Sequence, residues 1–363
     1  MKKIIFFSSN RADVAFIYNV FSLFEKNKDY RAKVILNDSS KIDLKFLKKD
    51  KIITFKKNKI NTGKYDLIYH VGNLLKKYNK LLSKIKPDYI FIVGDRYESF
   101  AMSIVCNFLN IKIIHIAGGD VSKGSYDDEM RTFISKSAYL HFATNIQSKK
   151  NLIKLVKDKS KIFNYGSPSL DYIKGIEKLD KQKLSRILNI RFNKYNLLIT
   201  FHPETKNLRH TVKNLKILLK ALSSLGTSYN LFMTGSNIDT FGEIFNKIIK
   251  DKVKNNKNFY FFSNLGTEKY IQLAKNCEMI IGNSSSLIYE IPFLGLRSLL
   301  IGSRQDGRFM SKKIIKVKLN KQMIIRKIQS NIKKNKIKKD LKTYGNGSAS
   351  VKIFKKVDKL INE

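Results

Sequence analysis

Three acidic residues in the first half of the chain stand just after short apolar runs. Asp95 follows the run Tyr89–Val93 and one glycine, and Asp120 follows the run Lys112–Ile116 and an Ala-Gly-Gly segment. Asp127 comes seven residues after Asp120. Carboxylates gathered in one cleft raise one another's pKa, which suits general acid–base catalysis. A simpler role is open for Asp95, as the N-cap of the following helix.

Arg131 lies four residues after Asp127, so the two side chains share a face at the start of an expected helix. The pair is a candidate part of the same acid–base site. The alternative is structural: Asp127 complements the helix dipole and forms a surface ion pair with Arg131.

His202 follows the apolar run Leu197–Phe201 in the second half of the chain and precedes Pro203. A histidine at the end of a buried strand can bind an anionic ligand. The alternative is a loop histidine whose position is fixed by Pro203.

The segment Gly282-Asn283-Ser284-Ser285-Ser286 follows another apolar run and opens an expected helix that contains Glu290. Backbone amides and hydroxyls at a helix N-terminus suit a diphosphate, and Glu290 suits ribose hydroxyls. An ordinary serine N-cap is the alternative. The sequence contains no Gly-x-Gly-x-x-Gly fingerprint and no Walker P-loop, so a dinucleotide or NTPase site is not supported.

The elements around these residues alternate between apolar runs and amphipathic stretches, which predicts parallel sheets covered on both faces. Expected strands are 4–7, 89–93, 112–116, 141–143, 161–165, 197–201, 230–233, 259–262, 279–281 and 298–301. Expected helices are 13–26, 72–85, 98–109, 131–138, 208–224, 239–249, 267–277, 288–294 and 349–361.

The alternation occurs in two series, separated near residues 166–169 and by the polar stretch 174–194. The predicted fold class is therefore α/β, with two Rossmann-like doubly wound domains facing a central cleft. The expected domains are residues 1–167, which carry the carboxylates, and 168–345, which bind the nucleotide. Residues 346–363 form a helix that is expected to pack back on the first domain. Ligands of such sheets bind at the carboxyl ends of the strands.

Composition narrows the class of protein. The 363 residues carry 71 Lys and Arg against 29 Asp and Glu, a formal charge of +42. The lysines are spread along the chain among Ile, Asn, Phe and Tyr, residue types with A/T-rich codons, and no nucleic-acid motif occurs. We therefore expect no specific nucleic-acid partner, although the positive field should attract anionic small molecules.

The cysteines, the histidines and the lengths of the apolar runs bear on cofactors and on location in the cell. Cys106 and Cys277 stand in apolar helical contexts and are expected to be buried free thiols. No His or Cys cluster has metal-ligand spacing, so we expect no metal. No apolar run is long enough for a membrane helix, and the run after Met1 ends too early for a signal peptide. A cytoplasmic protein without membrane partners is expected.

Taken together, these motifs resemble those of the hydrolysing UDP-N-acetylglucosamine 2-epimerases, especially the branch of sialic-acid and legionaminic-acid pathways. The resemblance runs nearly end to end. It is carried by residues 10–13, 94–98, 115–124, 127–142, 166–171, 202–203, 282–290 and 302–308. It implies the GT-B fold and a two-step reaction without metal or NAD. The nucleoside diphosphate is eliminated to leave a glycal, and water then adds with inversion at C2, which releases a free N-acetylmannosamine-type sugar.

The resemblance also implies roles for particular residues. The catalytic set is Asp95, Asp120, Asp127 and Arg131, in which Arg131 is expected to orient Asp127 or the substrate. The residues expected to bind the nucleotide are Arg11, His202, Ser284, Ser285, Glu290, Arg304 and Arg308. Relatives are often dimers, so a homodimer is expected.

This chain departs from the family pattern at several positions. Asp120 and Thr132 stand where Glu and His are common, and Leu287 stands where Gly is common and is expected to narrow the nucleotide pocket. Ser9-Asn10 replaces the usual Gly-Thr. The expected substrate is thus UDP-N-acetylglucosamine or a UDP- or GDP-linked 2,4-diacetamido-6-deoxy relative. Alternatives are a GT-B glycosyltransferase and a non-hydrolysing 2-epimerase.

Overall fold

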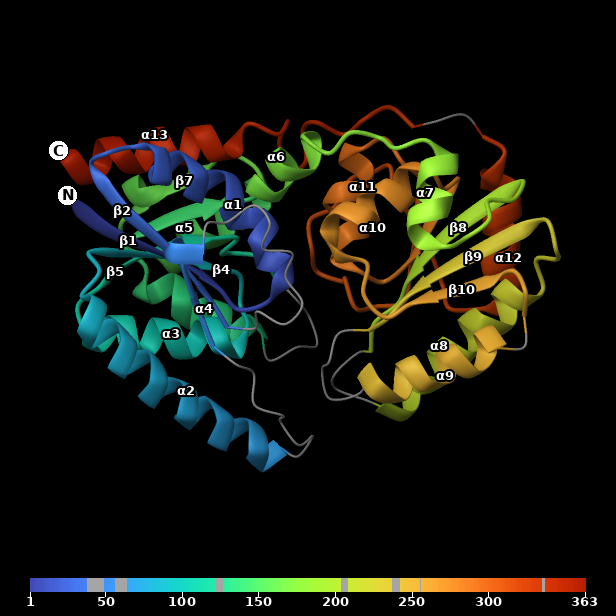
Figure 1. The fold of residues 1–363 in the computed structure, drawn as a ribbon, viewed down its shortest axis with the longest axis horizontal. Helices are drawn as coiled ribbons and strands as arrows, with labels where there is room; N and C mark the ends of the chain where they lie inside the picture. The colour runs from blue at the N-terminus through green and yellow to red at the C-terminus, as the bar shows by residue number, and fades with distance from the viewer. Residues whose placement is uncertain are drawn as a thin grey trace. The chain divides into compact units, whose positions relative to one another are not determined.

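The computed structural model describes residues 1–37, 49–55, 64–121, 127–203, 208–236, 242–254, 256–334 and 337–363. The described residues form two compact units. Unit 1 comprises Met1–Val121, Tyr126–Lys174 and Lys342–Glu363, and the main part of unit 2 is Gly175–Leu341. Each unit is built around one sheet (Figure 1).

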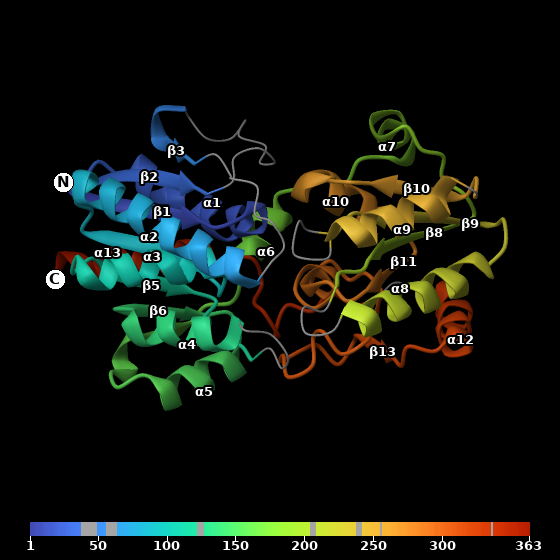
Figure 2. The same cartoon turned by 90° about the horizontal axis from the view of Figure 1, so that it is seen from below.

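The sheet of unit 1 is parallel, with the order β3-β2-β1-β4-β5-β6-β7 among the described residues. Figure 2 shows the succession from β3 through β2 and β1 to β5 and β6. The strands are β1 (Lys2–Ser8), β2 (Tyr30–Leu36), β3 (Ile52–Thr54), β4 (Tyr89–Val93), β5 (Lys112–Ile116), β6 (Leu140–Ala143) and β7 (Ile162–Asn164). The helices are α1 (Arg11–Lys26), α2 (Lys64–Ile85), α3 (Tyr97–Phe108), α4 (Asp127–Ser137), α5 (Ile146–Leu155), α6 (Pro168–Lys174) and α13 (Ala349–Asn362), with the short 3-10 helices η1 (Lys49–Lys51) and η2 (Lys159–Lys161).

The sheet of unit 2 is also parallel, with the order β10-β9-β8-β11-β12-β13. Its strands are β8 (Tyr195–Thr200), β9 (Tyr229–Thr234), β10 (Phe259–Phe262), β11 (Met279–Gly282), β12 (Ser298–Ile301) and β13 (Ile315–Val317). Its helices are α7 (Lys181–Leu188), α8 (Leu208–Ser223), α9 (Gly242–Lys254), α10 (Gly266–Lys275), the 3-10 helix η3 (Ser285–Leu287), α11 (Glu290–Phe293) and α12 (Lys321–Ile332).

Both units are doubly wound, because each sheet carries an apolar core on each face. In unit 1, Phe6 of β1 belongs to the core beneath α1 and α13, whereas its neighbour Phe7 belongs to the core beneath α2 and α3. In unit 2, α8 and α12 cover one face and α10 and α11 cover the other. Alternate side chains of a strand point to opposite faces, so continuous apolar runs are what a sheet covered on both faces requires.

The strand orders place a topological switch point in each unit. The order reverses between β1 and β4 in unit 1, and between β8 and β11 in unit 2. Ligands of open α/β sheets bind outside the carboxyl ends of the strands at this point. A ligand-binding site is therefore expected in the segments that follow these four strands.

The division between the units differs from the expected boundary at residue 167. Unit 1 continues to Lys174 because α6 packs on α1, where the rings of Tyr18 and Tyr172 lie 5.6 Å apart, edge to face. The chain returns to unit 1 at Lys342. There, Asp171 accepts hydrogen bonds from the backbone amides of Ala349 (3.1 Å) and Ser350 (2.6 Å). α13 then lies beside α1 on unit 1 (Figure 1).

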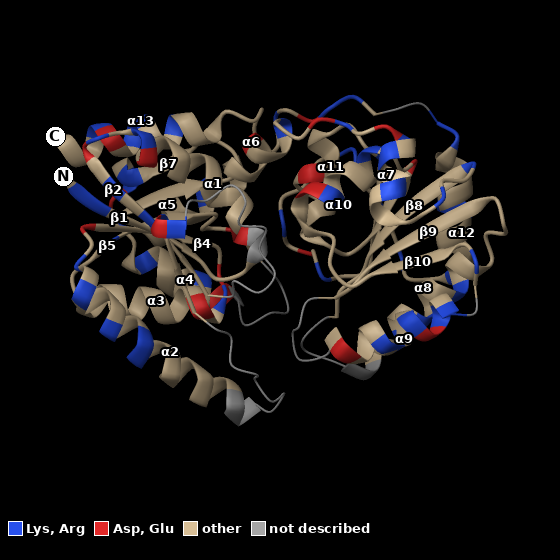
Figure 3. Cartoon of the chain, viewed as in Figure 1, with Lys and Arg blue, Asp and Glu red and all other residues tan. Residues whose placement is uncertain are grey.

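Lys and Arg are spread over many helices of both units (Figure 3). Cys106 and Cys277 are free and buried, which confirms the expectation for them. Among the helices of the described ranges, we find no stretch long and apolar enough to cross a bilayer.

Candidate active site

The switch point of unit 1 carries an ion pair between Asp95 and Arg131. Asp95 stands two residues beyond β4, and Arg131 lies on α4. Nη2 of Arg131 donates to Oδ2 of Asp95. The Asp95 side chain is 20% exposed and that of Arg131 is 3% exposed, so the carboxylate reaches the surface and the guanidinium does not. Arg131 therefore holds Asp95 in place from beneath.

The other terminal nitrogen of Arg131 joins two further segments. Nη1 donates to Oδ1 of Asp128 at 2.5 Å and to the backbone oxygen of Asp120 at 2.6 Å. Burial lowers the pKa of Arg131, but the negative charge of Asp95 outweighs it and raises the pKa above its usual value. The guanidinium stays charged and fixes the segments that carry Asp95 and Asp120. We call Asp95, Asp120, Asp128 and Arg131 the Arg131 cluster.

The carboxylate of Asp120 is held by α5. Its Oδ1 accepts hydrogen bonds from Nδ2 of Asn145 at 3.2 Å and from Oγ of Ser148. Asn145 is also the N-cap of α5, since its side chain accepts from the amide of Ser148. A side chain that caps a helix and also donates to a carboxylate gives Asp120 a defined orientation.

The N-cap alternative for Asp95 is wrong. The N-cap of α3 is Arg96, whose side chain makes no capping hydrogen bond. Asp95 sits in the turn before it, where Gly94 has a φ of +67°. Side chains other than glycine rarely adopt this backbone conformation, so the turn depends on a glycine.

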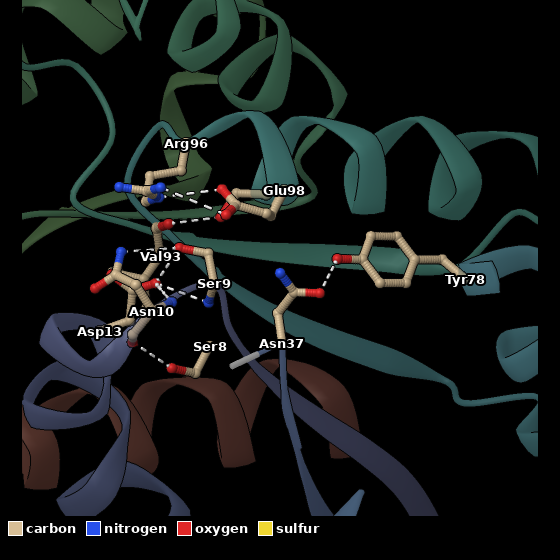
Figure 4. A network of polar contacts seen from close by, with 10 residues as sticks. Ser8, Ser9, Asn10, Asp13, Asn37, Tyr78, Val93, Arg96 and Glu98 are labelled. Carbon is tan, nitrogen blue, oxygen red and sulfur yellow. Dashed lines mark hydrogen bonds and ion pairs between the residues drawn. The ribbon is translucent and has the colours of Figure 1, made fainter. Parts of the chain in front are cut away.

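The loop after β1 lies at the same switch point and is organised by Asp13 (Figure 4). Its Oδ2 accepts from the amide of Ser9 at 2.9 Å, from Oγ of Ser9 at 2.5 Å and from the amide of Asn10 at 3.3 Å. Burial raises the pKa of Asp13 to about 6, and these hydrogen bonds and the charge of Arg96 offset part of that effect. This loop precedes Arg11, whose side chain lies outside the described residues.

Figure 4 also shows the ion pair of Arg96 and Glu98, which lies next to this loop. Nε of Arg96 lies 3.1 Å from Oε2 of Glu98, whose side chain is 2% exposed. A buried carboxylate of this kind requires its partner, so the pair fixes the start of α3. The loops after β1 and β4 are therefore both held by internal carboxylates.

The switch point of unit 2 is organised by Asn283. Its Oδ1 accepts from the amide of His202 at 2.7 Å, and its Nδ2 donates to the carbonyl of His202 at 2.8 Å. Its own carbonyl accepts from Nη1 of Arg304 at 3.3 Å and Nε2 of Gln305 at 2.8 Å. Asn283 thus brings the loops that carry His202 and Arg304 to the end of β11.

The serine segment forms a short 3-10 helix, η3, in which Ser284 is the N-cap and accepts from the amide of Ser286 at 3.3 Å. The N-cap alternative is therefore correct for Ser284. Within the described residues, the amides of Ser284 and Ser285 show no hydrogen bond to an acceptor. The hydroxyl oxygens of Ser286 and Tyr270 lie 2.7 Å apart and share a hydrogen bond. Two adjacent donors thus remain for a ligand at this turn.

Glu290 begins α11, just beyond this turn. Burial raises the pKa of its carboxyl to about 7. Its Oε2 is buried and has no hydrogen-bond partner in the described parts of the chain. A buried acceptor without a partner is costly, so a ligand that donates hydroxyl groups would satisfy it.

The backbone of Asp127 begins α4, but its side chain lies outside the described residues, so its orientation by Arg131 stays a prediction. Arg308 is half-buried in the loop after β12. Leu287 was expected to narrow the nucleotide pocket, but this is wrong: it is 0% exposed in the core with Leu198 and Ile280. In the described ranges, no group of three or more His, Cys, Asp or Glu is arranged to hold a metal ion.

Several residues that shape the site were missed by sequence reasoning. They are Asp128, Asn145 and Ser148 around the carboxylates, Asp13 beneath the first loop, and Asn283 and Tyr270 in unit 2. Asn145 had a signal, because an asparagine before a helical stretch predicts an N-cap. The others act through contacts between segments that are distant in sequence.

Two Rossmann-like units with these switch points define an α/β protein of the GT-B type. The family model for UDP-N-acetylglucosamine 2-epimerase matches residues 37–358, and the chain belongs to this family. It is 34% identical over 328 residues to the GDP/UDP-N,N'-diacetylbacillosamine 2-epimerase (hydrolyzing) of Campylobacter jejuni, covering 88% of this chain and 85% of that protein. It is 27% identical to the UDP-N,N'-diacetylbacillosamine 2-epimerase (hydrolyzing) of Legionella pneumophila, covering 78% and 74%.

Solved structures agree on the fold. The UDP-GlcNAc 2-epimerase of Neisseria meningitidis, bound to UDP-GlcNAc, matches with a TM-score of 0.79 at 19% identity and covers 100% of both chains. The UDP-GlcNAc 2-epimerase of Methanocaldococcus jannaschii, in complex with UDP-GlcNAc and UDP, matches with a TM-score of 0.79 at 20% identity and covers 99% and 100%. The predicted fold class of two Rossmann-like domains is therefore confirmed.

Proposed function

We propose that the protein is a hydrolysing 2-epimerase of a nucleotide-linked 2-acetamido sugar. Its substrate is UDP-N-acetylglucosamine or a UDP- or GDP-linked 2,4-diacetamido-6-deoxy relative, and its products are a free manno-configured sugar and the nucleoside diphosphate. The observation that carries the proposal is the Arg131 cluster at the carboxyl edge of the first sheet. The hydrolysing activities for which the Campylobacter and Legionella relatives are named support the hydrolytic outcome.

The proposed reaction has two balanced steps. The C1–O bond breaks with its electron pair going to the diphosphate, and a carboxylate removes the C2 proton, which leaves a C1–C2 double bond. Water then adds its hydroxyl to C1, while C2 receives a proton on the opposite face. The C2 proton is not acidic, so positive charge must develop at C1 first, and nearby carboxylates stabilise that charge.

In unit 1, we assign this chemistry to Asp95, Asp120 and Asp127. Asp95 is partly exposed and fixed by Arg131, and Asp120 is oriented by α5. One carboxylate transfers the C2 proton, and the others guide water and stabilise the cationic sugar. Arg131 acts as a positioning residue for Asp95.

In unit 2, we assign binding of the nucleoside diphosphate to the loops joined by Asn283. His202, Arg304 and Arg308 donate hydrogen bonds to the diphosphate. Such bonds are stronger than neutral ones because the acceptor is charged. The amides and hydroxyls of Ser284 and Ser285 bind a phosphate oxygen, and Glu290 accepts from the ribose. In unit 1, Arg11 is assigned to the diphosphate.

The test is analysis of products from a panel of nucleotide sugars. The purified protein is incubated in D₂O with UDP-N-acetylglucosamine, and separately with UDP- and GDP-linked N,N'-diacetylbacillosamine. We expect release of the nucleoside diphosphate and a free manno-configured sugar with deuterium at C2. A C2 epimer with the nucleotide still attached would indicate a non-hydrolysing epimerase. Nucleotide release only after addition of a sugar acceptor would indicate a glycosyltransferase.

We also propose that the protein is a homodimer. Ile68 and Tyr69 on α2 are 67% and 75% exposed, and exposed apolar side chains of this size support an interface. Sedimentation analysis at several concentrations tests this proposal, and a constant monomer mass would contradict it.

A further inference from the structure

His115 is buried beneath the Arg131 cluster, and both of its ring nitrogens are engaged. The residue lies on β5 and is 0% exposed. Its Nε2 lies 2.8 Å from the carbonyl oxygen of Gly94, and its Nδ1 lies 3.1 Å from Oγ of Ser135. The imidazole therefore joins the turn after β4 to α4.

These two attachment points flank the ion pair of the proposed site. Gly94 directly precedes Asp95, and Ser135 lies one helical turn after Arg131, on the same face of α4. The amide of Gly94 also donates to the carbonyl of Ile116 at 3.0 Å. β5 thus holds Gly94 through both its amide and its carbonyl group.

The contacts determine the proton arrangement of the ring. A carbonyl oxygen only accepts hydrogen bonds, so Nε2 carries the proton and Nδ1 accepts from the hydroxyl of Ser135. Burial lowers the pKa of His115 to about 3, with opposing effects from the carbonyl of Gly94 and from Asp95. The ring is therefore neutral at ordinary pH and is held in one tautomer.

Gly118 packs directly on the bond between His115 and Ser135. A Cβ atom at this position would lie 2.7 Å from Nδ1 of His115 and 2.9 Å from Oγ of Ser135. Such distances are too short for real contacts, so only glycine fits. The loop that leads to Asp120 therefore rests on the same hydrogen bond.

We propose that His115 is a positioning residue of the reaction. Its bonds to Gly94 and Ser135 fix the separation between the segments that carry Asp95 and Arg131, and so fix the direction of the Asp95 carboxylate. His115 itself does not touch the substrate. The inference rests on the proposed function, because Asp95 is assigned its role there.

The test uses graded variants and a matched control. Ser135→Ala removes one bond. His115→Gln keeps an amide at the reach of Nε2, whereas His115→Asn is too short to reach Gly94. The control is His141→Gln, because His141 is the neighbour of His115 in register on β6, is 1% exposed, and has no hydrogen-bond partner in the described residues.

We expect kcat for nucleotide release to fall about fivefold in Ser135→Ala, as the loss of one hydrogen bond implies. His115→Asn should fall about 100-fold, as geometric misplacement of a reacting group implies, and His115→Gln should restore part of that loss. KM should stay within about twofold, because His115 supports the carboxylate and not the substrate-binding groups. His141→Gln should keep kcat near that of the wild type even where Tm falls.

The inference is overturned if Ser135→Ala and His115→Asn fold and keep wild-type kcat, or if His141→Gln loses as much activity as His115→Asn. Imidazole ¹⁵N spectra give a readout that does not depend on activity. They should show one neutral tautomer of His115, protonated at Nε2, from pH 8 to pH 5. A mixture of tautomers would overturn the inference even if the wild type were inactive, whereas inactivity with a single tautomer would count against the proposed function alone.

Discussion

Arg131 of α4 donates through Nη2 to Asp95, a residue 36 positions earlier in the chain. Through Nη1, the same guanidinium binds Asp128 and the backbone of Asp120. One buried side chain thus sets the position of two of the three carboxylates assigned to catalysis. Its planar, forked donors suit this arrangement, which a lysine could not reproduce.

Replacing Asp95 with asparagine should remove most of the activity. The protein should still fold, with reduced stability, because the amide oxygen can accept from Arg131 and Asp128 still pairs with the guanidinium. Asparagine keeps the shape but has neither the negative charge nor the ability to take a proton. We expect kcat for nucleotide release to fall by about 10²–10⁴-fold with little change in KM. Glu129→Gln is the control, since Glu129 is an exposed acid on α4. Full turnover by Asp95→Asn would show that this carboxylate is not catalytic.

Arg131→Met should destabilise the protein as well as slow it. The carboxylates of Asp95 and Asp128 reach solvent, so the cost is that of the lost charged hydrogen bonds, about 1.5–3 kcal/mol in the free energy of unfolding. Urea unfolding measures this change. Lys136→Met, an exposed cation on the same helix, should change it by less than about 0.5 kcal/mol. Equal effects of the two substitutions would exclude a structural ion pair at Arg131.

Ser148→Ala tests the orientation of Asp120. The substitution removes the hydroxyl that donates to Oδ1 of Asp120 and keeps the hydrogen bond from the amide of Asn145. The loss of one hydrogen bond corresponds to about a fivefold fall in kcat. Ser160→Ala removes an exposed hydroxyl that donates to Asp158, and it should have no effect on kcat. If both variants turn over like the wild type, the Ser148 contact is not needed for catalysis.

Glu290→Gln should change the dependence of stability on pH. Burial raises the pKa of Glu290 from 4.5 to about 7, so the folded state favours the protonated carboxyl. The stabilisation of the wild type from this group is complete below pH 4.5 and is lost as pH rises through 7. Glutamine is always neutral, so Tm of the variant minus Tm of the wild type should be larger at pH 8 than at pH 5. The exposed Glu243→Gln should show no such difference. An unchanged difference would argue against a raised pKa.

Tyr270→Phe should weaken nucleotide binding. The phenol hydroxyl contacts Oγ of Ser286 at 2.7 Å and so supports the serine turn from α10. We expect the Kd for UDP to rise about fivefold, as the loss of one hydrogen bond implies, when measured by calorimetry. Tyr260→Phe is the control, because Tyr260 lies on β10 and its hydroxyl accepts from the amide of Arg191 at 3.4 Å. A larger effect of the control would place the nucleotide elsewhere.

Much of the fold could be predicted from the sequence because buried parallel strands are continuous apolar runs. β4, β5, β10 and β12 have the expected bounds. β2 was missed because Arg31 and Lys33 interrupt its apolar residues, and these two point outward. α12 was missed because its buried residues Ile324 and Ile328 stand among many polar ones. Both elements are stabilised by tertiary packing, which the pattern of residues along the chain does not reveal.

The candidate site could be predicted only in part. Acidic and serine residues at strand ends were found, because their position relative to the sheet follows from the chain. The partner of Asp95 was not found, because α3, β5 and a loop separate Asp95 from Arg131 in the chain. Asn283 was missed for the same reason, since its pairing with His202 joins segments 81 residues apart.

The core of unit 1 includes residues from both sides of unit 2 in the chain. Ile353 and Val357 of α13 pack with Phe6 and Phe24 at 0% exposure. During synthesis on the ribosome, β1 to β7 therefore emerge long before the helix that covers them. The polypeptide of unit 2 is complete earlier, so unit 2 can finish folding before unit 1 has its last helix. A stop codon before Ala349 would leave the part of this apolar face that α13 covers exposed to water.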